Sequence, residues 1–351
     1  MAEAYIVDAL RTAGGRRNGA LRDWHPADMG AAVIDALLAK SGIDPAAVDD
    51  VIVGCVSQVG EQSFHVGRNM VLASSLPETV PAVTIDRQCG SSQQALHFAA
   101  QAVMSGTQDI VLAAGVEHMT RVPMGTPTIL AMQAGIGKGP WSEALLEKFG
   151  VTEFSQFTGA QMIADRYGFT REWLDVFALE SHRRAAIATD AGAFDDEIVP
   201  LRIVGTDGEE TLHTRDEGVR RDASLEGLAG LKTIKPGGVI TAGNASQLSD
   251  GASACVVMDR QLAEQRGALL PEEVVGILSQ AAKALDKAHA LVLAIEVTPR
   301  DRAGEQIEIT ELAPSALGEV IGRRLDINTG SIQRIMTQDR CQSGQVAWVG
   351  G

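Results

Sequence analysis

Four short apolar runs in the first third of the chain predict buried strands, and two longer segments with helical periodicity predict helices between them. The strands are Ala4–Val7, Asp50–Val56, Pro81–Asp86 and Asp109–Gly115, and the helices are Ala27–Lys40 and Ser91–Met104. Strands that alternate with helices at this spacing are typical of crossover units with parallel strands. An α/β fold is therefore predicted.

The helix predicted at Ser91–Met104 has a stripe of apolar residues at helical spacing, which we expect to pack on the sheet. The stripe consists of Ala95, Phe98, Ala99, Ala102 and Val103. The pair Ser105-Gly106 ends this helix, and Gly42 ends the first one.

From about residue 123 to residue 234 the segments become longer and more polar. Helices are predicted near Gly159–Tyr167 and Arg171–Asp190, and strand patterns return at Val239–Thr241 and Ala252–Asp259. We therefore expect an N-terminal half whose first part is 1–122, an insertion at 123–234 folded over it, return strands at 235–260, and a shortened C-terminal half at 261–351.

A weak internal repeat relates the two predicted halves. Three segments of the first half resemble three of the second in the same order: Asp49–Val56 and Gln306–Ala313, Val83–Asp86 and Leu325–Asn328, Ser105–Gly115 and Ser343–Gly351. A duplicated α/β unit would produce this pattern, and so would chance similarity among short apolar strands.

Composition narrows the functional classes. The 351 residues carry a formal charge of −15, which argues against nucleic acid or an anionic membrane as the main partner. No run approaches the roughly 20 apolar residues of a membrane span, and the N-terminal residues do not read as a signal peptide. The four cysteines have no metal-ligand spacing, so we expect no metal site and a reducing, cytoplasmic location.

Cys89 is the strongest candidate for chemistry. It follows a predicted buried strand and begins a predicted helix, where peptide dipoles favour thiolate over thiol. Gly90 permits close approach of the backbone, so the N–H of Cys89 can serve as an oxyanion site. The alternative is that Cys89 is a small buried filler of the core.

The segment around Cys89, Arg87–Gln94 (RQCGSSQQ), resembles the nucleophilic-cysteine segment of thiolases, the acyl-CoA acetyltransferases. Five further segments resemble the same family in the family's order. They are Ala4–Arg17, Ala114–Gly125, Phe177–Arg184, Leu225–Lys232 and Ile240–Ala252 (ITAGNASQLSDGA). The resemblance implies a thiolase fold of two similar α/β halves, of the βαβαβ type, with a loop domain inserted in the first.

The family's reaction implies roles for particular residues. Cys89 would be the acylated nucleophile, with coenzyme A as substrate and no resident cofactor. Arg221 is a candidate for the nucleotide of CoA, because its guanidinium fits phosphate, and Ala242 and Ser246 for the pantetheine arm. Gln156 and Phe157 match the substrate loop. Arg221 as a solvated charge and Phe157 as core packing remain alternatives.

The second half departs from the family's motifs. Where the family has an Asn-Glu-Ala-Phe segment, this chain has Thr310–Ala313, and no histidine follows His289 to match the family's Gly-His-Pro segment. Cys341 is the candidate for the family's second, proton-shuttling cysteine, although it aligns equally well with a helix end. General acid–base groups contribute about 10²–10⁴-fold each, so their loss would weaken carbon–carbon bond formation most.

Three functions follow from these patterns. The first is an active thiolase, acting on acyl-CoA as a homodimer or homotetramer. The second is an acyl-CoA-binding protein or partner subunit of the same fold with little turnover. The third, a condensing enzyme of fatty-acid or polyketide synthesis, ranks last because that class relies on two histidines in its second half.

Overall fold

The computed structural model of the chain describes residues 3–205 and 208–266. Nearly all of the predicted C-terminal half lies outside the described residues, including the three repeat segments of that half and Cys341.

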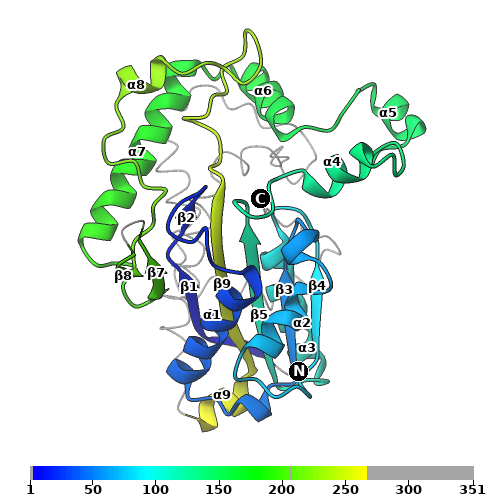
Figure 1. Cartoon of the computed structure of the whole chain (residues 1–351), viewed down its shortest axis with the longest axis vertical. Helices are drawn as coiled ribbons and strands as arrows, with labels where there is room; N and C mark the ends of the chain where they lie inside the picture. The colour runs from blue at the N-terminus through cyan, green and yellow to red at the C-terminus, as the bar shows by residue number, and fades with distance from the viewer. Residues whose placement is uncertain (1–2, 206–207, 267–351) are drawn as a thin grey trace, which may run out of the picture.

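A seven-stranded mixed sheet forms the centre of the described part, in the order β4-β3-β5-β9-β1-β6, with the short β2 paired to β9 (Figure 1). Its strands are β1 (Ala4–Thr12), β2 (Gly15–Arg16), β3 (Asp50–Gly54), β4 (Ala82–Ile85), β5 (Ile110–His118), β6 (Ile198–Val199) and β9 (Ser249–Asp259). β3 pairs in parallel with β4 and β5, whereas β9 runs antiparallel to β5 and β1. Strands β1, β3, β4 and β5 therefore all end at the edge where β9 begins, which we call the carboxyl edge.

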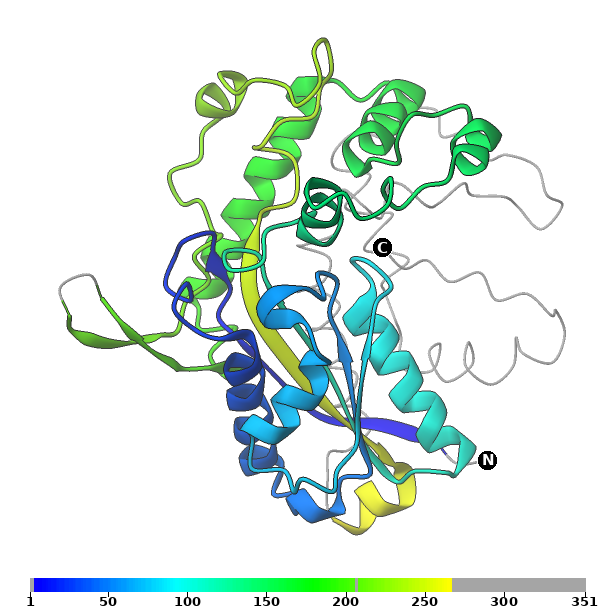
Figure 2. The ribbon, with the colours of Figure 1, turned by 45° about the vertical axis from the view of Figure 1, so that its right-hand side comes forward.

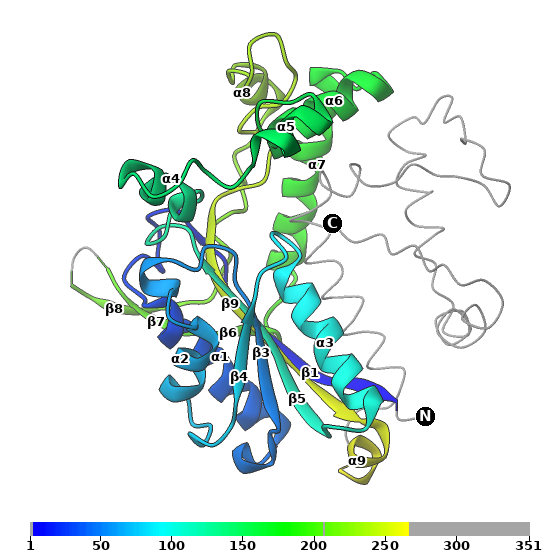
Figure 3. The same ribbon diagram turned by 90° about the vertical axis from the view of Figure 1, so that its right-hand side faces the viewer.

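Helices cover both faces of the sheet, as the side view shows (Figure 3). One face carries α1 (Pro26–Ser41) and α2 (Val66–Ala73), and the other carries α3 (Ser91–Ser105). Single turns at η1 (Pro45–Ala47) and η2 (Gly60–Gln62) and a short α9 (Arg260–Gln265) complete this unit. The predicted α/β architecture is confirmed.

The helix ends follow from local sequence. Pro26 stands at the first position of α1, and the His25 side chain accepts a hydrogen bond from the Ala27 N–H. Gly42 and Gly106 end α1 and α3 in the left-handed conformation, which glycine adopts without strain. On α3 the small residues of the predicted stripe pack on the sheet, but Phe98 is 43% exposed.

A long insertion leaves the sheet after His118 and returns at Ser249, and it contributes the short edge strand β6 to the sheet between these points. It contains α4 (Thr126–Gln133), α5 (Glu143–Phe149), α6 (Gln156–Tyr167), α7 (Arg171–Asp190), the hairpin β7 (Leu201–Val204) and β8 (Glu210–His213), and α8 (Leu225–Ala229). The helices α4 to α8 lie beyond the carboxyl edge (Figure 2). The strand predicted at Val239–Thr241 is wrong, since only an isolated bridge joins Thr233 to Thr241.

The insertion is fastened to the sheet by a cluster of charges around Arg11. This side chain lies 2.7 Å from both Glu197 and Asp216, and Asp216 also accepts the Gly14 N–H. Burial alone would raise the pKa of Asp216, but its hydrogen bond to Arg11 lowers the pKa below the ordinary value. β6 adds a backbone link, because its Ile198 is the register partner of Arg11 in β1.

Candidate active site

Cys89 lies at the carboxyl edge, in the turn that joins β4 to α3. Its side chain is exposed, Gly90 is the N-cap, and α3 begins at Ser91. No side chain in the described part of the chain hydrogen-bonds to the Cys89 sulfur. The sulfur is therefore exposed at the positive end of the helix dipole, as the sequence predicts, although the N–H groups of Gly90 and Ser91 already donate to the carbonyls of Arg87 and Gln88.

Local hydrogen bonds fix the turn that carries Cys89. The Gln88 N–H donates to Asp86 Oδ1 at 2.7 Å, while Ser91 Oγ donates to the Gln88 carbonyl at 2.6 Å and accepts the Arg87 N–H. Gln88 adopts a φ of 51°, a conformation that costs energy for a residue with a Cβ. The residue before the candidate nucleophile is thus held in a strained geometry by its neighbours.

Two glycines allow α3 to approach the sheet closely. Gly54 of β3 and Gly115 of β5 are paired in register, and both face the first turn of α3. A Cβ on Gly54 would overlap the backbone of Ser91 and Ser92, lying 2.7 Å from the Ser91 carbonyl oxygen. The position of Cys89 relative to the sheet therefore depends on glycine at Gly54.

The other two described cysteines are chemically unlike Cys89. Burial raises the pKa of Cys55 to about 12, and the nearby carboxylates of Glu117 and Asp86 act in the same direction. Burial also raises the pKa of Cys255 to about 12. Both remain protonated thiols near neutral pH, and thiols in that form are poor nucleophiles.

We expect iodoacetamide near pH 7.5 to modify Cys89 at least about tenfold faster than Cys55 or Cys255, because the thiolate is the reactive form. Peptide mapping by mass spectrometry after short reaction times measures the three rates separately. Equal rates at Cys89 and Cys55 would contradict the accessibility described here.

The structure places the other predicted site residues on three segments of the insertion. Gln156 and Phe157 begin α6, Arg221 lies before α8, and Ala242 and Ser246 lie in the stretch that leads into β9. A hydrogen bond of 2.8 Å from the Val239 N–H to Gln161 Oε1 joins this stretch to α6. The structure therefore brings the α6 segment and the stretch before β9 together, and the Gln247 side chain of that stretch donates to the Gly218 carbonyl at 2.8 Å, three residues before Arg221.

Arg221 forms a bidentate ion pair with Asp190 at the end of α7, and both nitrogen–oxygen distances are 2.8 Å. The hydrogen bond to Arg221 lowers the pKa of Asp190. Both side chains are solvent-exposed, so this pair contributes little to stability. A phosphate bound by Arg221 would have to compete with Asp190.

A buried network that the sequence analysis did not single out shapes the stretch with Ala242. Asn244 is 4% exposed, accepts the Thr241 N–H, and donates to Asp175 Oδ1 at 3.0 Å. Asp175 is paired in turn with Arg171 on the same helix. The only sequence signal for this role is the position of Asn244 inside the Ile240–Ala252 motif.

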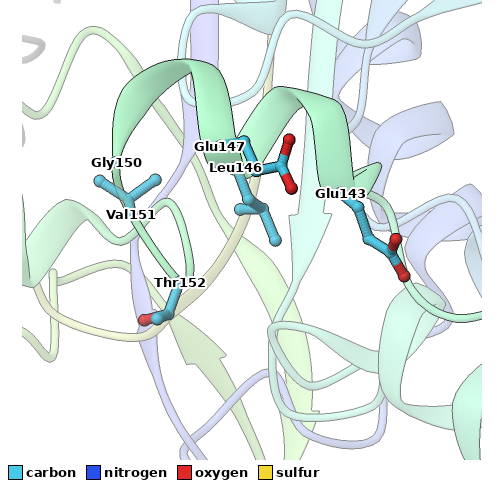
Figure 4. A pocket seen from close by; sticks show the side chains of 6 residues that line it. All are labelled: Glu143, Leu146, Glu147, Gly150, Val151 and Thr152. Carbon is cyan, nitrogen blue, oxygen red and sulfur yellow. The ribbon is translucent and has the colours of Figure 1, made fainter.

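An open hollow of about 400 Å³ lies on α5, at the outer end of the insertion (Figure 4). It is lined by Glu143, Leu146, Glu147, Gly150, Val151 and Thr152, none of them a predicted site residue.

Within residues 3–205 and 208–266, no group of three or more His, Cys, Asp or Glu side chains could hold a metal ion. None of the helices described there is long and apolar enough to cross a membrane.

Residues 4–261 match the family model for the N-terminal domain of thiolase. The steroid 3-ketoacyl-CoA thiolase FadA6 of Mycobacterium tuberculosis is 45% identical over 269 residues, which cover 76% of this chain and 64% of that protein. A 3-ketoacyl-CoA thiolase of Aliivibrio fischeri is 35% identical over 352 residues, covering 95% of this chain and 88% of the relative. One from Escherichia fergusonii is 40% identical over 274 residues, covering 76% and 67%.

The sheet, the helices on its two faces and the cysteine before α3 define an α/β protein whose residues 4–261 match the thiolase N-terminal domain. The chain belongs to the thiolase family, whose relatives here are enzymes acting on 3-ketoacyl-CoA. The resemblance drawn from the sequence motifs is thereby confirmed, together with the thiolase fold. The roles assigned to Gln156, Phe157, Arg221, Ala242 and Ser246 stay predictions, and Cys341 lies outside the described residues.

Proposed function

We propose that this protein is a thiolase-type acyltransferase that forms an acyl-enzyme on Cys89 and acts on 3-ketoacyl-CoA and CoA. The observation that carries the proposal is the exposed sulfur of Cys89 at the N-terminus of α3, at the edge of a thiolase sheet. The names of the relatives support the choice of substrate class.

In the thiolytic direction, the Cys89 thiolate attacks the 3-keto carbonyl carbon. The bond between C2 and C3 breaks, its electron pair stays on C2, and protonation there releases acetyl-CoA. The thiolate of CoA then attacks the acyl group on Cys89 and leaves with it as a shortened acyl-CoA. The backbone N–H of Cys89, at the positive end of the α3 dipole, is the candidate donor that stabilises the negative oxygen in both steps.

The insertion supplies the candidate contacts for CoA, which acts as a substrate rather than a resident cofactor. Ala242 and Ser246 lie in a stretch held by the buried Asn244, so a pantetheine arm would meet a fixed surface. Arg221 would exchange its Asp190 partner for a phosphate, a ligand that its guanidinium binds through two parallel bonds.

Thiolysis is tested by mixing the protein with acetoacetyl-CoA and CoA and following the loss of the β-ketothioester absorbance. We expect turnover above the uncatalysed rate. Binding of acyl-CoA without turnover would instead support the acyl-CoA-binding alternative and overturn the proposed activity.

We also propose that two copies of the chain associate through β4. This strand lies at one end of the sheet, Val83 on it is 40% exposed, and Phe64 nearby along the chain is 97% exposed. Unpaired strand edges with apolar side chains are suited to pairing with another chain. We expect sedimentation velocity to show an assembly that Val83→Asp shifts towards monomer, with Ile129→Asp on α4 as an exposed apolar control. A monomeric wild-type protein would contradict this interface.

A cytoplasmic location remains part of the proposal. Cys55, Cys89 and Cys255 are all free thiols in the structure, a state that a reducing compartment maintains. The net charge of −15 argues against nucleic acid as the main partner.

A further inference from the structure

Besides the links through β6 and Arg11, the two ends of the insertion meet at the sheet around His118, Thr120 and Asp250, which we call the neck. The chain leaves the sheet at His118, the last residue of β5, and returns beside it, because Asp250 of β9 is the register partner of His118. Both side chains are completely buried, at 0% exposure. This buried histidine and carboxylate therefore lie at the two points where the segment 119–248 leaves and rejoins the sheet.

Asp250 binds three donors from the neck. Its Oδ1 accepts the Thr120 N–H at 2.8 Å and lies 3.2 Å from His118 Nδ1, while its Oδ2 accepts the Thr120 hydroxyl at 2.5 Å. Thr120 Oγ1 also accepts the Asn18 N–H at 2.8 Å. The first residues of the insertion are thus tied to β9 and to the loop after β2.

The geometry around His118 admits two protonation states with different partners. Nε2 lies 2.9 Å from the carbonyl oxygen of Leu21, which can only accept, so Nε2 carries a proton. Nδ1 faces both Asp250 Oδ1 and the Arg121 N–H, the latter at 3.3 Å. The imidazolium donates to Asp250, whereas the neutral ring turns a lone pair towards that carboxylate and accepts from Arg121.

Burial alone would lower the pKa of His118, but its hydrogen bonds to Asp250 and to the Leu21 carbonyl together raise it above the ordinary value of about 6.5. Burial would raise the pKa of Asp250, and its bonds to His118 and Thr120 lower it instead. The positive charge of Arg121 disfavours the charged form of His118 and so acts to lower its pKa. Glu61 of η2 interacts electrostatically with His118 and also with His25.

The sign of the linkage follows from these directions. A raised pKa for His118 in the folded protein gives stabilisation that is complete below the unfolded value and is lost as pH rises through the folded value. A lowered pKa for Asp250 gives stabilisation that is lost only in acid. The ion pair is therefore formed between the folded pKa of Asp250 and that of His118, and it opens as pH rises through the raised pKa of His118.

The neck also connects to the loop after β3. The His118 N–H donates to Gln62 Oε1 at 2.7 Å, and Gln62 Nε2 donates to Glu117 Oε1 at 3.0 Å. Glu117 accepts the N–H groups of Val56 and Ser57. This loop lies at the carboxyl edge, as does the turn that carries Cys89.

We propose that His118 and Asp250 are positioning residues that set the insertion relative to the sheet for CoA binding, and that loss of the His118 proton weakens this binding at alkaline pH. The inference rests on the proposed function, because it requires the insertion to hold CoA. The pair acts through the insertion and touches neither the reacting atoms nor Cys89.

The test measures acetyl-CoA affinity by calorimetry in the Cys89→Ala background, in which no turnover disturbs the equilibrium. Between about pH 6 and pH 9.5, as pH rises through the raised pKa of His118, we expect the affinity to fall about tenfold, a change of the size that typical coupling energies produce. His118→Gln and Asp250→Asn should bind about tenfold more weakly than the parent at the acid end of this range and show a flat profile. The double variant should be no weaker than either single one, because the two side chains act as a pair.

Kinetics with Cys89 intact separates positioning from chemistry. We expect His118→Gln to raise KM for the CoA substrates about tenfold and to change kcat by less than about threefold. Arg260→Gln is the matched control, because it removes exposed ion pairs with Glu3 and Glu264. This variant should change neither KM nor kcat.

An unchanged affinity in His118→Gln, or the same pH profile in that variant and its parent, overturns the positioning role. The wild-type profile tests the inference even if both variants unfold. If the parent protein binds no acetyl-CoA at any pH, the proposed function has failed. Hydrogen exchange then decides the role of the pair, since His118→Gln should accelerate exchange across 119–248 while leaving α1 protected.

Discussion

Cys89→Ala is expected to reduce thiolysis of acetoacetyl-CoA by at least about 10³-fold, because the covalent route through the sulfur disappears. The residue is exposed and precedes the N-cap of α3, so its side chain supports no core contact. The variant should therefore fold as the parent does and keep its affinity for acetyl-CoA. Steady-state kinetics with calorimetry on the same preparation measures both properties.

Cys255→Ala is the matched control for that loss, because it removes a thiol of the same sheet whose pKa burial raises to about 12. We expect thiolysis by Cys255→Ala to stay within about threefold of wild type. Equal losses in the two variants would show that the assay responds to folding rather than to the nucleophile.

Gly54→Ala is expected to abolish most activity without touching any reactive group. The new Cβ would overlap the backbone of Ser91 and Ser92, so the first turn of α3 must move away from β3. Overpacking of this kind costs about 1–3 kcal/mol of stability. A displacement of about 1 Å at Cys89 can cost about 10²-fold in rate. Thermal unfolding and kinetics on the purified variant check the two effects.

Gly159→Ala provides the matched control, since a Cβ at this helical glycine of α6 meets nothing within 4 Å. Alanine has the higher helix propensity, so this variant should be more stable by up to about 1 kcal/mol and equally active. If Gly54→Ala behaved in the same way, the close approach of α3 to β3 would have no part in placing Cys89.

The elements that could be predicted were those with a strong local signal. α7 begins and ends at the residues predicted from its periodicity, and the continuous apolar run of β5 was recognised as a buried strand. The hairpin β7–β8 was missed because its strands are short and largely exposed, within a charged stretch. Helix α4 was missed because its sequence has no apolar stripe that marks a packed face. In the structure none of its residues is buried.

The site was predictable in its nucleophile and less so in its support. Cys89 could be found because strand, cysteine and helix follow one another directly in the sequence. The partners of His118 could not, since Asp250 lies more than a hundred residues away and becomes a neighbour only through the pairing of β5 with β9. The same holds for Asn244 and Asp175, which meet across the insertion. Such pairs are set by strand register and helix packing, which a single sequence does not display.

Acylation of Cys89 is measured directly by mixing the protein with acetyl-CoA, quenching in acid, and mapping the modified peptide by mass spectrometry. We expect one acetyl group per chain on the sulfur of Cys89, released again when CoA is added. An acetyl group on another residue, or none on a protein that binds acetyl-CoA, would contradict it.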